Sequence, residues 1–260
     1  MSYDIIGNIA LVKFNEKTGE RNKKKIAKEL LEKHPNIKTV LEKTERVKGR
    51  LRTIKTKHLA GERTKEAEYK ENGCAFRFNI EKCYFSPRLA EERKRLMQMC
   101  RKGERILVMF GGVAPYAVVI AKNKTEIKKV VSVELGKECN RYARWNAEKN
   151  KVSSKVRLIQ GDVKKVLPKL KAKGEKFDRI IMARPNLKET FLKWALMVAR
   201  KGAIIHYHGF SHEDDMEKMV EEIRKECGKE KRKIKVLRVS KAGDIAPGKY
   251  RYRADIRVMN

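Results

Sequence analysis

The segment "CYFSPRLAEER", residues 83–93, combines residue types that can grip a polar, electron-rich ring and remove a proton from it. On a helix that begins near Leu89, Glu92 and Arg93 lie about one turn beyond Arg88, so these groups could converge on one spot. The plain alternative is a salt-bridged helix N-terminus with solvated charges. The segment immediately precedes a strand that is expected to bind a ligand, and this position favours a substrate site.

Three later strands end, in chain order, in residues that suit one nucleoside-like ligand. "VMFGGVAPY" runs from a strand through Gly111-Gly112 into a helix, which exposes bare backbone and a helix N-terminus. "VVSVE" ends in Glu134, whose carboxylate can accept both hydroxyls of a ribose, and "VRLIQGDV" ends in Asp162, placed to contact an adenine edge. An ordinary tight turn or a helix N-cap explains each of these residues alone. Their occurrence in order favours a shared ligand.

Two further groups of residues carry weaker signals. "IIHYHGF" alternates two histidines on a strand like a metal pair, but no third ligand follows at suitable spacing. Histidines that form hydrogen bonds at a strand end are the better interpretation, and no metal is expected. The basic stretch "VKGRLRTIKTKHLAGE" is either solvated surface or a set of phosphate contacts that hold nucleic acid without reading it. The histidines are His206 and His208, and the basic residues are Arg50, Arg52, Lys55 and Lys57.

The elements that must position these residues change in character near residue 81. Residues 1–14 alternate like a strand, "GERNKKKIAKELLEKHP" is typical of a basic helix, and "EYKENGCAFRFNIEKCYFSP" predicts a hairpin with its turn at Asn72-Gly73. We therefore expect a small α+β domain over residues 1–81 that binds RNA or substrate. Over residues 82–260, strands buried on both faces alternate with helices, which predicts a doubly wound α/β sheet of Rossmann-like type.

The bulk composition bounds the class of partner. The 260 residues include 65 basic and 33 acidic side chains, for a net charge of +32. Such a positive surface attracts polyanions, most commonly nucleic acid. A charge-rich thermophile surface is the alternative, but it explains the 38% of charged residues better than the imbalance between the signs. Five scattered cysteines without a CxxC pair, no signal peptide and no membrane-length apolar run favour a cytoplasmic protein.

Together these segments resemble one family, the archaeal and eukaryotic-type tRNA (guanine(37)-N(1))-methyltransferases. The resemblance covers nearly the whole chain and is carried by "YDIIGNIALV", "VKGRLRTIKTKHLAGE", "YFSPRLAEER", "MFGGVAPYAVVIAK", "RIIMARPNLKETFL", "GAIIHYH" and "DIAPGKYRYRADIRV". It implies a class I S-adenosylmethionine-dependent methyltransferase fold, S-adenosylmethionine as cofactor and the anticodon region of tRNA as partner. A monomer is expected, and the family's extra N-terminal domain, which docks the tRNA elbow, is expected to be missing.

The resemblance also implies residue roles. Glu92 corresponds to the family's general base, Arg52 to an arginine that stabilises negative charge on guanine O6, and Arg88 and Arg93 to residues that shape the pocket. The target base would have to swing out of the anticodon stack. The expected catalytic residues are therefore Glu92, Arg52 and Arg88. The expected cofactor-binding residues are Phe85, Arg93, Phe110, Gly111, Gly112, Val113, Glu134, Leu135, Asp162, Val163 and Ala183.

Four departures from the family pattern keep alternatives open. Val108 replaces an acid, Ala114 replaces a glycine, Glu134-Leu135-Gly136-Lys137 replaces an Asp-x-Asn-Pro motif, and Ala183-Arg184-Pro185 replaces Asn-Leu-Pro. A related archaeal aminocarboxypropyl transferase of wybutosine biosynthesis shares the fold, the cofactor and "GAIIHYH", although Arg88 and Leu89 favour methyl transfer. A tRNA-binding paralogue with weak or lost catalysis, and a methyltransferase of another RNA, are the remaining alternatives.

Overall fold

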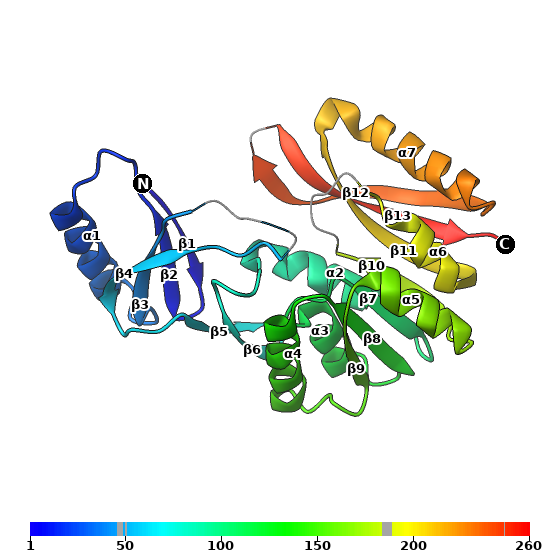
Figure 1. Cartoon of the computed structure of the whole chain (residues 1–260), viewed down its shortest axis with the longest axis horizontal. Coiled ribbons are helices and arrows are strands. Elements are labelled where there is room, and N and C mark those ends of the chain that lie inside the picture. Colours follow the sequence, from blue (N-terminus) through cyan, green and yellow to red (C-terminus); the bar gives the residue numbers. More distant parts are fainter. Residues whose placement is uncertain (46–48, 50, 184–188, 247) are drawn as a thin grey trace.

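The computed structural model describes residues 1–45, 49, 51–183, 189–246 and 248–260. Its first unit is a four-stranded sheet in the order β1-β2-β3-β4, with one helix packed on it (Figure 1). Ala27 and Leu30 of the helix join Val12 and Val40 of the strands in a small core of their own. The elements are β1 (Ser2–Ile6), β2 (Ile9–Lys13), α1 (Glu20–Lys33), β3 (Thr39–Lys43) and β4 (Thr56–Gly61).

The predicted hairpin is confirmed as β5 (Glu66–Glu71) and β6 (Cys74–Asn79). Asn72 and Gly73 both take positive φ angles, 46° and 72°, as a tight two-residue turn requires. Asn146 of the helix Lys137–Lys149 and Asn150, which caps the C-terminus of that helix, bond to the backbone of β6. The apolar face of the hairpin joins the core of the large domain. The domain boundary near residue 81 stays a prediction.

The large domain is built on a seven-stranded sheet in the order β12-β13-β11-β10-β7-β8-β9. The five strands from β11 to β9 run parallel, while β13 lies antiparallel between β11 and β12. The doubly wound sheet that the sequence predicts is therefore confirmed, with an antiparallel pair at one edge. The strands are β7 (Arg105–Met109), β8 (Lys129–Glu134), β9 (Val156–Gln160), β10 (Phe177–Met182), β11 (Ala199–His212), β12 (Ile234–Ala246) and β13 (Lys249–Val258).

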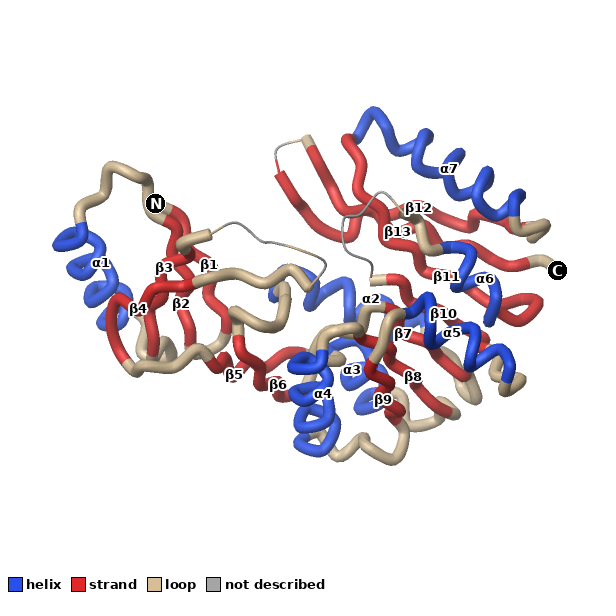
Figure 2. Tube along the Cα trace, in the orientation of Figure 1, coloured by secondary structure: helices blue, strands red, loops and turns tan. Residues whose placement is uncertain are grey.

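Helices cover both faces of this sheet, as Figure 2 shows. On one face, the core contains Leu96 of α2, Val118 of α3 and Tyr142 of α4. On the opposite face, the core contains Leu167 of α5 and Ile223 of α7. The helical elements are η1 (Pro87–Leu89), α2 (Ala90–Met99), α3 (Pro115–Asn123), α4 (Lys137–Lys149), α5 (Val163–Ala172), α6 (Leu192–Val198), η2 (Glu213–Asp215) and α7 (Met216–Lys229). Among the described residues, no helix combines the length and the apolar character needed to cross a bilayer.

The strand order fixes where a ligand can bind. The chain winds outward from the middle of the sheet in two directions, through β8 and β9 on one side and β10 and β11 on the other. The loops that leave β7 and β10 therefore diverge, which opens a crevice at the carboxyl ends of these neighbouring strands. The strands β7, β8 and β9 all end at this edge, so the expected ligand-binding residues at their ends lie there as well.

Candidate active site

A cavity lies at the carboxyl edge of the large sheet. The turn after β7 and the ends of β8 and β9 form one wall, and the segment before α2 forms the other. Among the residues that line it are Arg52, Tyr84, Phe85, Arg93, Phe110, Gly111, Gly112, Tyr116, Glu134, Leu135, Asp162, Val163, Ala183, Phe191 and Arg251. We refer to this space as the main cavity.

The glycine turn after β7 leaves backbone facing the main cavity. Gly111 donates its backbone N–H to Val133 O at 2.9 Å, and a Cβ on Gly111 would lie 2.1 Å from Ser132 Oγ. Gly112 has a φ of +57°, and Ala114 has a φ of +64° at the start of α3. The alanine that replaces the family's glycine therefore keeps the left-handed backbone conformation that glycine adopts most easily.

Glu134 at the end of β8 joins this turn to the next loop. Its carboxylate accepts the backbone N–H of Gly112 at 2.8 Å and that of Gly136 at 2.7 Å. Burial raises the pKa of Glu134 above its usual range, against the lowering effect of these backbone donors. The carboxylate faces the main cavity, and its contact with a ribose stays a prediction.

Asp162, directly after β9, caps a helix and also lines the main cavity, and its contact with an adenine edge stays a prediction. Its Oδ1 accepts the backbone N–H of Lys164 at 2.9 Å, so the side chain caps the N-terminus of α5. The same residue lines the main cavity. A cap at this position orients the side chain and the helix N-terminus toward a ligand.

The opposite wall comes from the first unit and from the segment before α2. The guanidinium of Arg52 lies 3.9 Å from the ring centre of Tyr84, and its buried Nε has no hydrogen-bond partner among the described residues. Arg93 is buried in an ion pair with Glu71 of the hairpin and lies 4.9 Å from the ring centre of Phe85. An arginine held by a carboxylate and a ring gives this wall a fixed shape.

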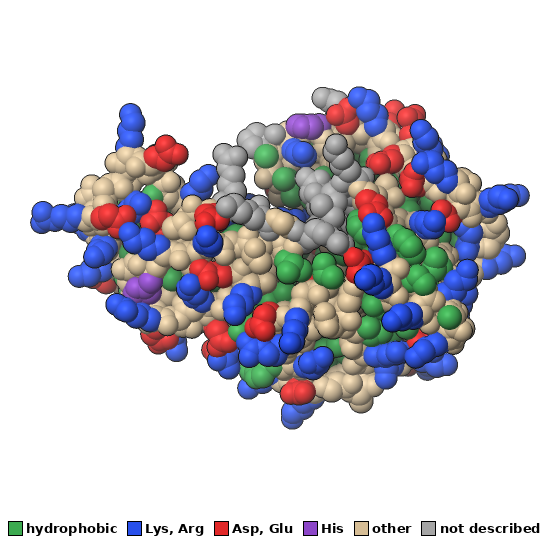
Figure 3. Space-filling view, in the orientation of Figure 1, with side chains coloured by type: hydrophobic (Ala, Val, Ile, Leu, Met, Phe, Trp, Pro, Cys, Tyr) green, Lys and Arg blue, Asp and Glu red, His purple; other side chains and the backbone are tan. Residues whose placement is uncertain are grey.

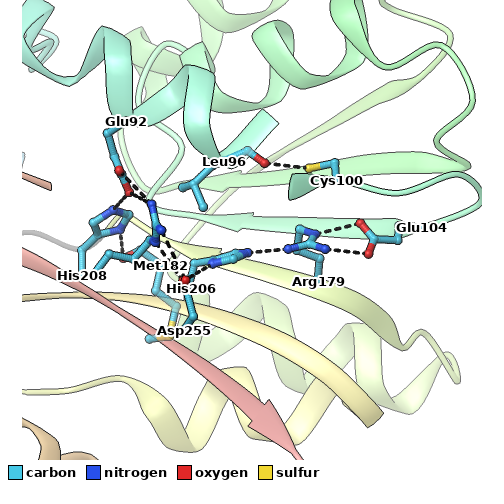
Figure 4. A network of polar contacts seen from close by, with 10 residues as sticks. Glu92, Leu96, Cys100, Glu104, Arg179, Met182, His206, His208 and Asp255 are labelled. Atoms are coloured by element: carbon cyan, nitrogen blue, oxygen red, sulfur yellow. Dashed lines mark hydrogen bonds and ion pairs between the residues drawn. The ribbon is translucent and has the colours of Figure 1, made fainter. Parts of the chain in front are cut away.

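Glu92 lies behind this wall, in a buried polar network (Figure 4). Arg253 Nη1 donates to both carboxylate oxygens of Glu92 at 2.9 Å. His208 Nε2 lies 2.9 Å from Glu92 Oε1, and its Nδ1 lies 3.3 Å from Met182 O. Burial opposes ionisation of Glu92, but His208 and Arg253 outweigh it and hold its pKa below the usual range. Glu92 is therefore a buried, ionised carboxylate.

The network continues through residues of neighbouring strands (Figure 4). Arg253 Nε donates to Asp255 Oδ1 at 2.8 Å, and the same oxygen accepts His206 Nδ1 at 2.6 Å. Arg179 donates to His206 Nε2 at 2.6 Å and pairs with Glu104. Burial lowers the pKa of His206 to about 4, so the ring is neutral at pH 7. Both histidines thus form hydrogen bonds within the fold, and the described residues contain no cluster of three potential metal ligands.

The structure brings together most of the residues expected to form the site. All the expected cofactor-binding residues line the main cavity except Val113, which is buried in the core. Of the expected catalytic residues, Arg52 lines it. Arg88 instead forms an exposed ion pair with Asp4 at 2.5 Å and lines a neighbouring cavity. Arg50 and Arg184 lie outside the described residues.

Arg88, Glu92 and Arg93 do not converge, because Arg88 belongs to the 3₁₀ turn η1 and the other two belong to α2. A 3₁₀ turn has three residues per turn, so it shifts the phase on which the one-turn spacing argument relied. Each of the three side chains has a different acidic or basic partner. Lys55 and Lys57 lie on the surface, in ion pairs with Glu45 and Glu20.

Sequence reasoning missed four aromatic or basic residues of the main cavity: Tyr84, Tyr116, Phe191 and Arg251. Tyr84 and Tyr116 stand inside the quoted motifs, so their neighbours gave a signal. Phe191 packs edge-on against Phe110, with ring centres 5.0 Å apart, and carries no local motif. Arg251 reaches the cavity only because β13 pairs with β11.

A sequence profile described as the TRM5/TYW2 methyltransferase domain matches residues 67–237, and one described as the TYW2 N-terminal domain matches residues 1–64. The chain belongs to the TRM5/TYW2 family. The family resemblance that the sequence indicates is therefore confirmed, and with it the class I methyltransferase fold and the S-adenosylmethionine-dependent enzyme class.

Two curated relatives of this TRM5/TYW2 protein match it almost end to end. The tRNA (guanine(37)-N(1))-methyltransferase Trm5b of Pyrococcus abyssi is 36% identical over 258 residues, which cover 99% of this chain and 74% of the relative. The tRNA (guanine(37)-N(1))/4-demethylwyosine(37)-methyltransferase Taw22 of Nanoarchaeum equitans is 33% identical over 304 residues, covering 98% and 99%.

Solved structures agree with these relatives. The crystal structure of P. abyssi Trm5b superposes with a TM-score of 0.87 at 34% identity and covers all of this chain and 75% of that one. A complex of aTrm5 and tRNALeu gives 0.86 at 30% identity, covering 100% and 72%. P. horikoshii TYW2 in complex with MeSAdo gives 0.83 at 25% identity, covering 99% and 90%.

The main cavity fits S-adenosylmethionine, the cofactor of the TRM5/TYW2 family. Bare backbone at Gly111 and Gly112, the carboxylate of Glu134 and the capped helix at Asp162 all face it. The buried hydroxyl of Tyr116 on the same wall has no hydrogen-bond partner among the described residues, and a bound polar ligand would satisfy it. The cofactor expected from the sequence is thus confirmed for this chain's family.

Proposed function

We propose that this protein methylates N1 of guanosine 37 in the anticodon region of tRNA. The names of the relatives Trm5b and Taw22, and the tRNALeu complex of aTrm5, support this substrate. The net charge of +32 supports a polyanionic partner. The observation that carries the proposal is the cavity itself, which joins the cofactor-binding turn to a cationic wall with a buried carboxylate behind it.

The reaction requires that guanine N1 lose its proton as the methyl group arrives. When bound, S-adenosylmethionine supplies an activated, electrophilic methyl group. Glu92 is the proposed proton acceptor, because it is buried and its lowered pKa keeps it ionised at neutral pH. A low pKa also makes a carboxylate a weak base, so neighbouring cations must make the N1 proton more acidic.

Arg52 is the proposed source of that assistance. Loss of the N1 proton moves negative charge onto guanine O6, and a fixed guanidinium beside O6 stabilises this charge. The stacking of Arg52 on Tyr84 and its unpaired Nε leave hydrogen-bonding capacity toward the main cavity. Arg93 shapes the pocket through Glu71. Arg88 has the least structural support among the proposed catalytic residues, since it pairs with Asp4 on the surface.

The test compares the wild type with Glu92→Gln and with Glu91→Gln. Glu91 is the neighbouring exposed acid on α2, so it controls for loss of charge. With unmodified tRNA and labelled cofactor, we expect Glu92→Gln to lower the single-turnover rate constant about 100-fold or more, without loss of cofactor binding. Glu91→Gln should leave the rate unchanged.

Mass spectrometry of the product nucleoside decides the chemistry. A methylguanosine supports the proposal, and an aminocarboxypropyl adduct would support the alternative transferase. If the wild type is inert on tRNA, or if Glu92→Gln retains full activity, the proposed function or the proposed base is wrong, respectively. Calorimetry with S-adenosylmethionine then separates a binding paralogue from an enzyme with another RNA substrate.

A further inference from the structure

Arg251 on β13 is a buried cation without an acidic partner. It is 4% exposed, and the structure gives it neither a hydrogen bond nor an ion pair with any described residue. Its guanidinium lies 4.8 Å from the ring centre of Phe210. Arg251 differs in this from the other buried arginines, Arg93, Arg179 and Arg253, which each pair with a carboxylate.

A buried unpaired guanidinium lowers the stability of the fold that contains it. The guanidinium has lost its water and forms no ion pair with an acidic side chain, and burial lowers the pKa of Arg251. An arginine side chain stays charged near neutral pH even so. A cation kept at such a cost is typical of a site that completes its partner set with a ligand.

The position of Arg251 indicates where that ligand lies. The residue lines the main cavity and also a second cavity, whose lining comes from the first unit, from residues 78–89 and from the β12–β13 hairpin. Arg52 and Tyr84 line both cavities as well. The charges of Arg52 and Glu92 both act on Arg251. Arg251 thus stands at the junction of the two cavities, within the field of the proposed base.

We propose that Arg251 donates to O6 of the target purine and shares with Arg52 the negative charge that develops there. This inference rests on the proposed function. N1 and O6 are attached to the same carbon of guanine, so a base that presents N1 toward Glu92 presents O6 to a cation in its immediate surroundings. A phosphate is the less suitable ligand, because phosphates stay with the solvated backbone while the flipped base enters the buried pocket.

The test uses the full chain with Arg251→Met, Arg251→Lys and the control Arg257→Met. Arg257 is an exposed arginine on the same strand. We expect Arg251→Met to lower the single-turnover rate constant about 100-fold, as loss of a charge-stabilising donor does. Its rate–pH profile should shift to higher pH, because N1 is harder to deprotonate. Arg251→Lys should recover part of the rate, and Arg257→Met should match the wild type.

Two further readouts separate this role from others. The melting temperature of Arg251→Met should rise above that of the wild type, since the substitution removes a buried unpaired charge. The Kd for tRNA should change less than threefold, and the slope of its salt dependence should stay close to that of the wild type. An inert wild type would overturn the proposed function. With an active wild type, the inference fails if Arg251→Met keeps its rate, if it lowers the melting temperature, or if it changes only tRNA affinity and salt slope, which indicates a phosphate contact.

Discussion

Gly111 is the residue at which the main cavity depends most directly on the absence of a side chain. A Cβ there would meet Ser132 Oγ at 2.1 Å, and Ser132 is buried on β8. We predict that Gly111→Ala lowers the free energy of unfolding by about 1–3 kcal/mol, as overpacking does, and weakens binding of S-adenosylmethionine. Denaturant titration and calorimetry measure the two effects.

A second substitution, at Ser132, tests whether this clash causes the predicted losses. In the double variant Gly111→Ala/Ser132→Ala, the hydroxyl is gone and the nearest remaining side-chain atom, Ser132 Cβ, lies 3.5 Å from the new methyl group. Stability and cofactor affinity should therefore return toward wild-type values. Strictly additive losses in the double variant would contradict this interpretation, because residues that clash should show coupling.

Residues at the sheet edge could be predicted from the sequence because strand ends in a doubly wound fold share one edge. Gly111, Glu134 and Asp162 follow consecutive strands, so their convergence follows from chain order alone. Arg251 could not be found in this way. It reaches the cavity through the pairing of β13 with β11, opposite Phe210, and no local pattern encodes that pairing.

At the scale of elements, β13, β11 and β10 hold one chain of buried, hydrogen-bonded polar side chains between them. Asp255 on β13, His206 on β11 and Arg179 on β10 succeed one another across neighbouring strands. The sequence predicted the strands and their hydrogen-bonded histidines. It did not predict the network, because residues that are far apart along the chain must meet in register before their charges can pair.

This network predicts a particular loss of stability in acid. The pKa of His206 is about 4 in the fold and 6.5 in an unfolded chain, so the unfolded state binds more protons between these values. The contribution of His206 is therefore a fall in stability as pH decreases from 6.5 to 4, and this contribution levels off below pH 4. The shift corresponds to about 3 kcal/mol. Urea titrations across this range measure it.

The decisive comparison is the pH slope of stability, not its absolute value. His206→Gln removes the titrating ring, so its stability should fall less steeply between pH 6.5 and 4, even if the variant is less stable at neutral pH. His212→Gln, on an exposed histidine of the same strand, should keep the wild-type slope. An unchanged slope in His206→Gln would show that another group causes the acid sensitivity.

At the scale of the whole molecule, lysine and arginine side chains are spread over much of the visible surface (Figure 3). Buried acids such as Glu71, Glu92 and Asp255 are already paired within the fold. The excess positive charge is therefore left for the surface, where a polyanion can reach it. This distribution suits the tRNA partner that we propose.

The two units meet at a turn that excludes any side chain. Gly7, between β1 and β2, has a φ of +60°, and a Cβ on it would lie 1.8 Å from the backbone oxygen of Glu68 in the hairpin. Asn8 reinforces this contact, since its Oδ1 accepts the backbone N–H of Glu68 at 2.7 Å. Backbone cannot rotate away as a side chain can. The first unit must therefore shift if Gly7 is replaced.

We predict that Gly7→Ala lowers methyl transfer to tRNA but leaves the binding of S-adenosylmethionine nearly unchanged. Arg52 belongs to the first unit, so a shift of that unit moves Arg52 away from the main cavity, while the glycine turn and Glu134 stay in the large domain. Methyl transfer to tRNA should fall at least tenfold. The Kd for S-adenosylmethionine should stay within about threefold of the wild-type value, which is a free-energy difference of less than about 1 kcal/mol. Gly19→Ala is the matched control, since nothing lies within 4 Å of a Cβ at that position. If Gly7→Ala transfers methyl groups at the wild-type rate, docking of the first unit at this turn does not set the position of Arg52.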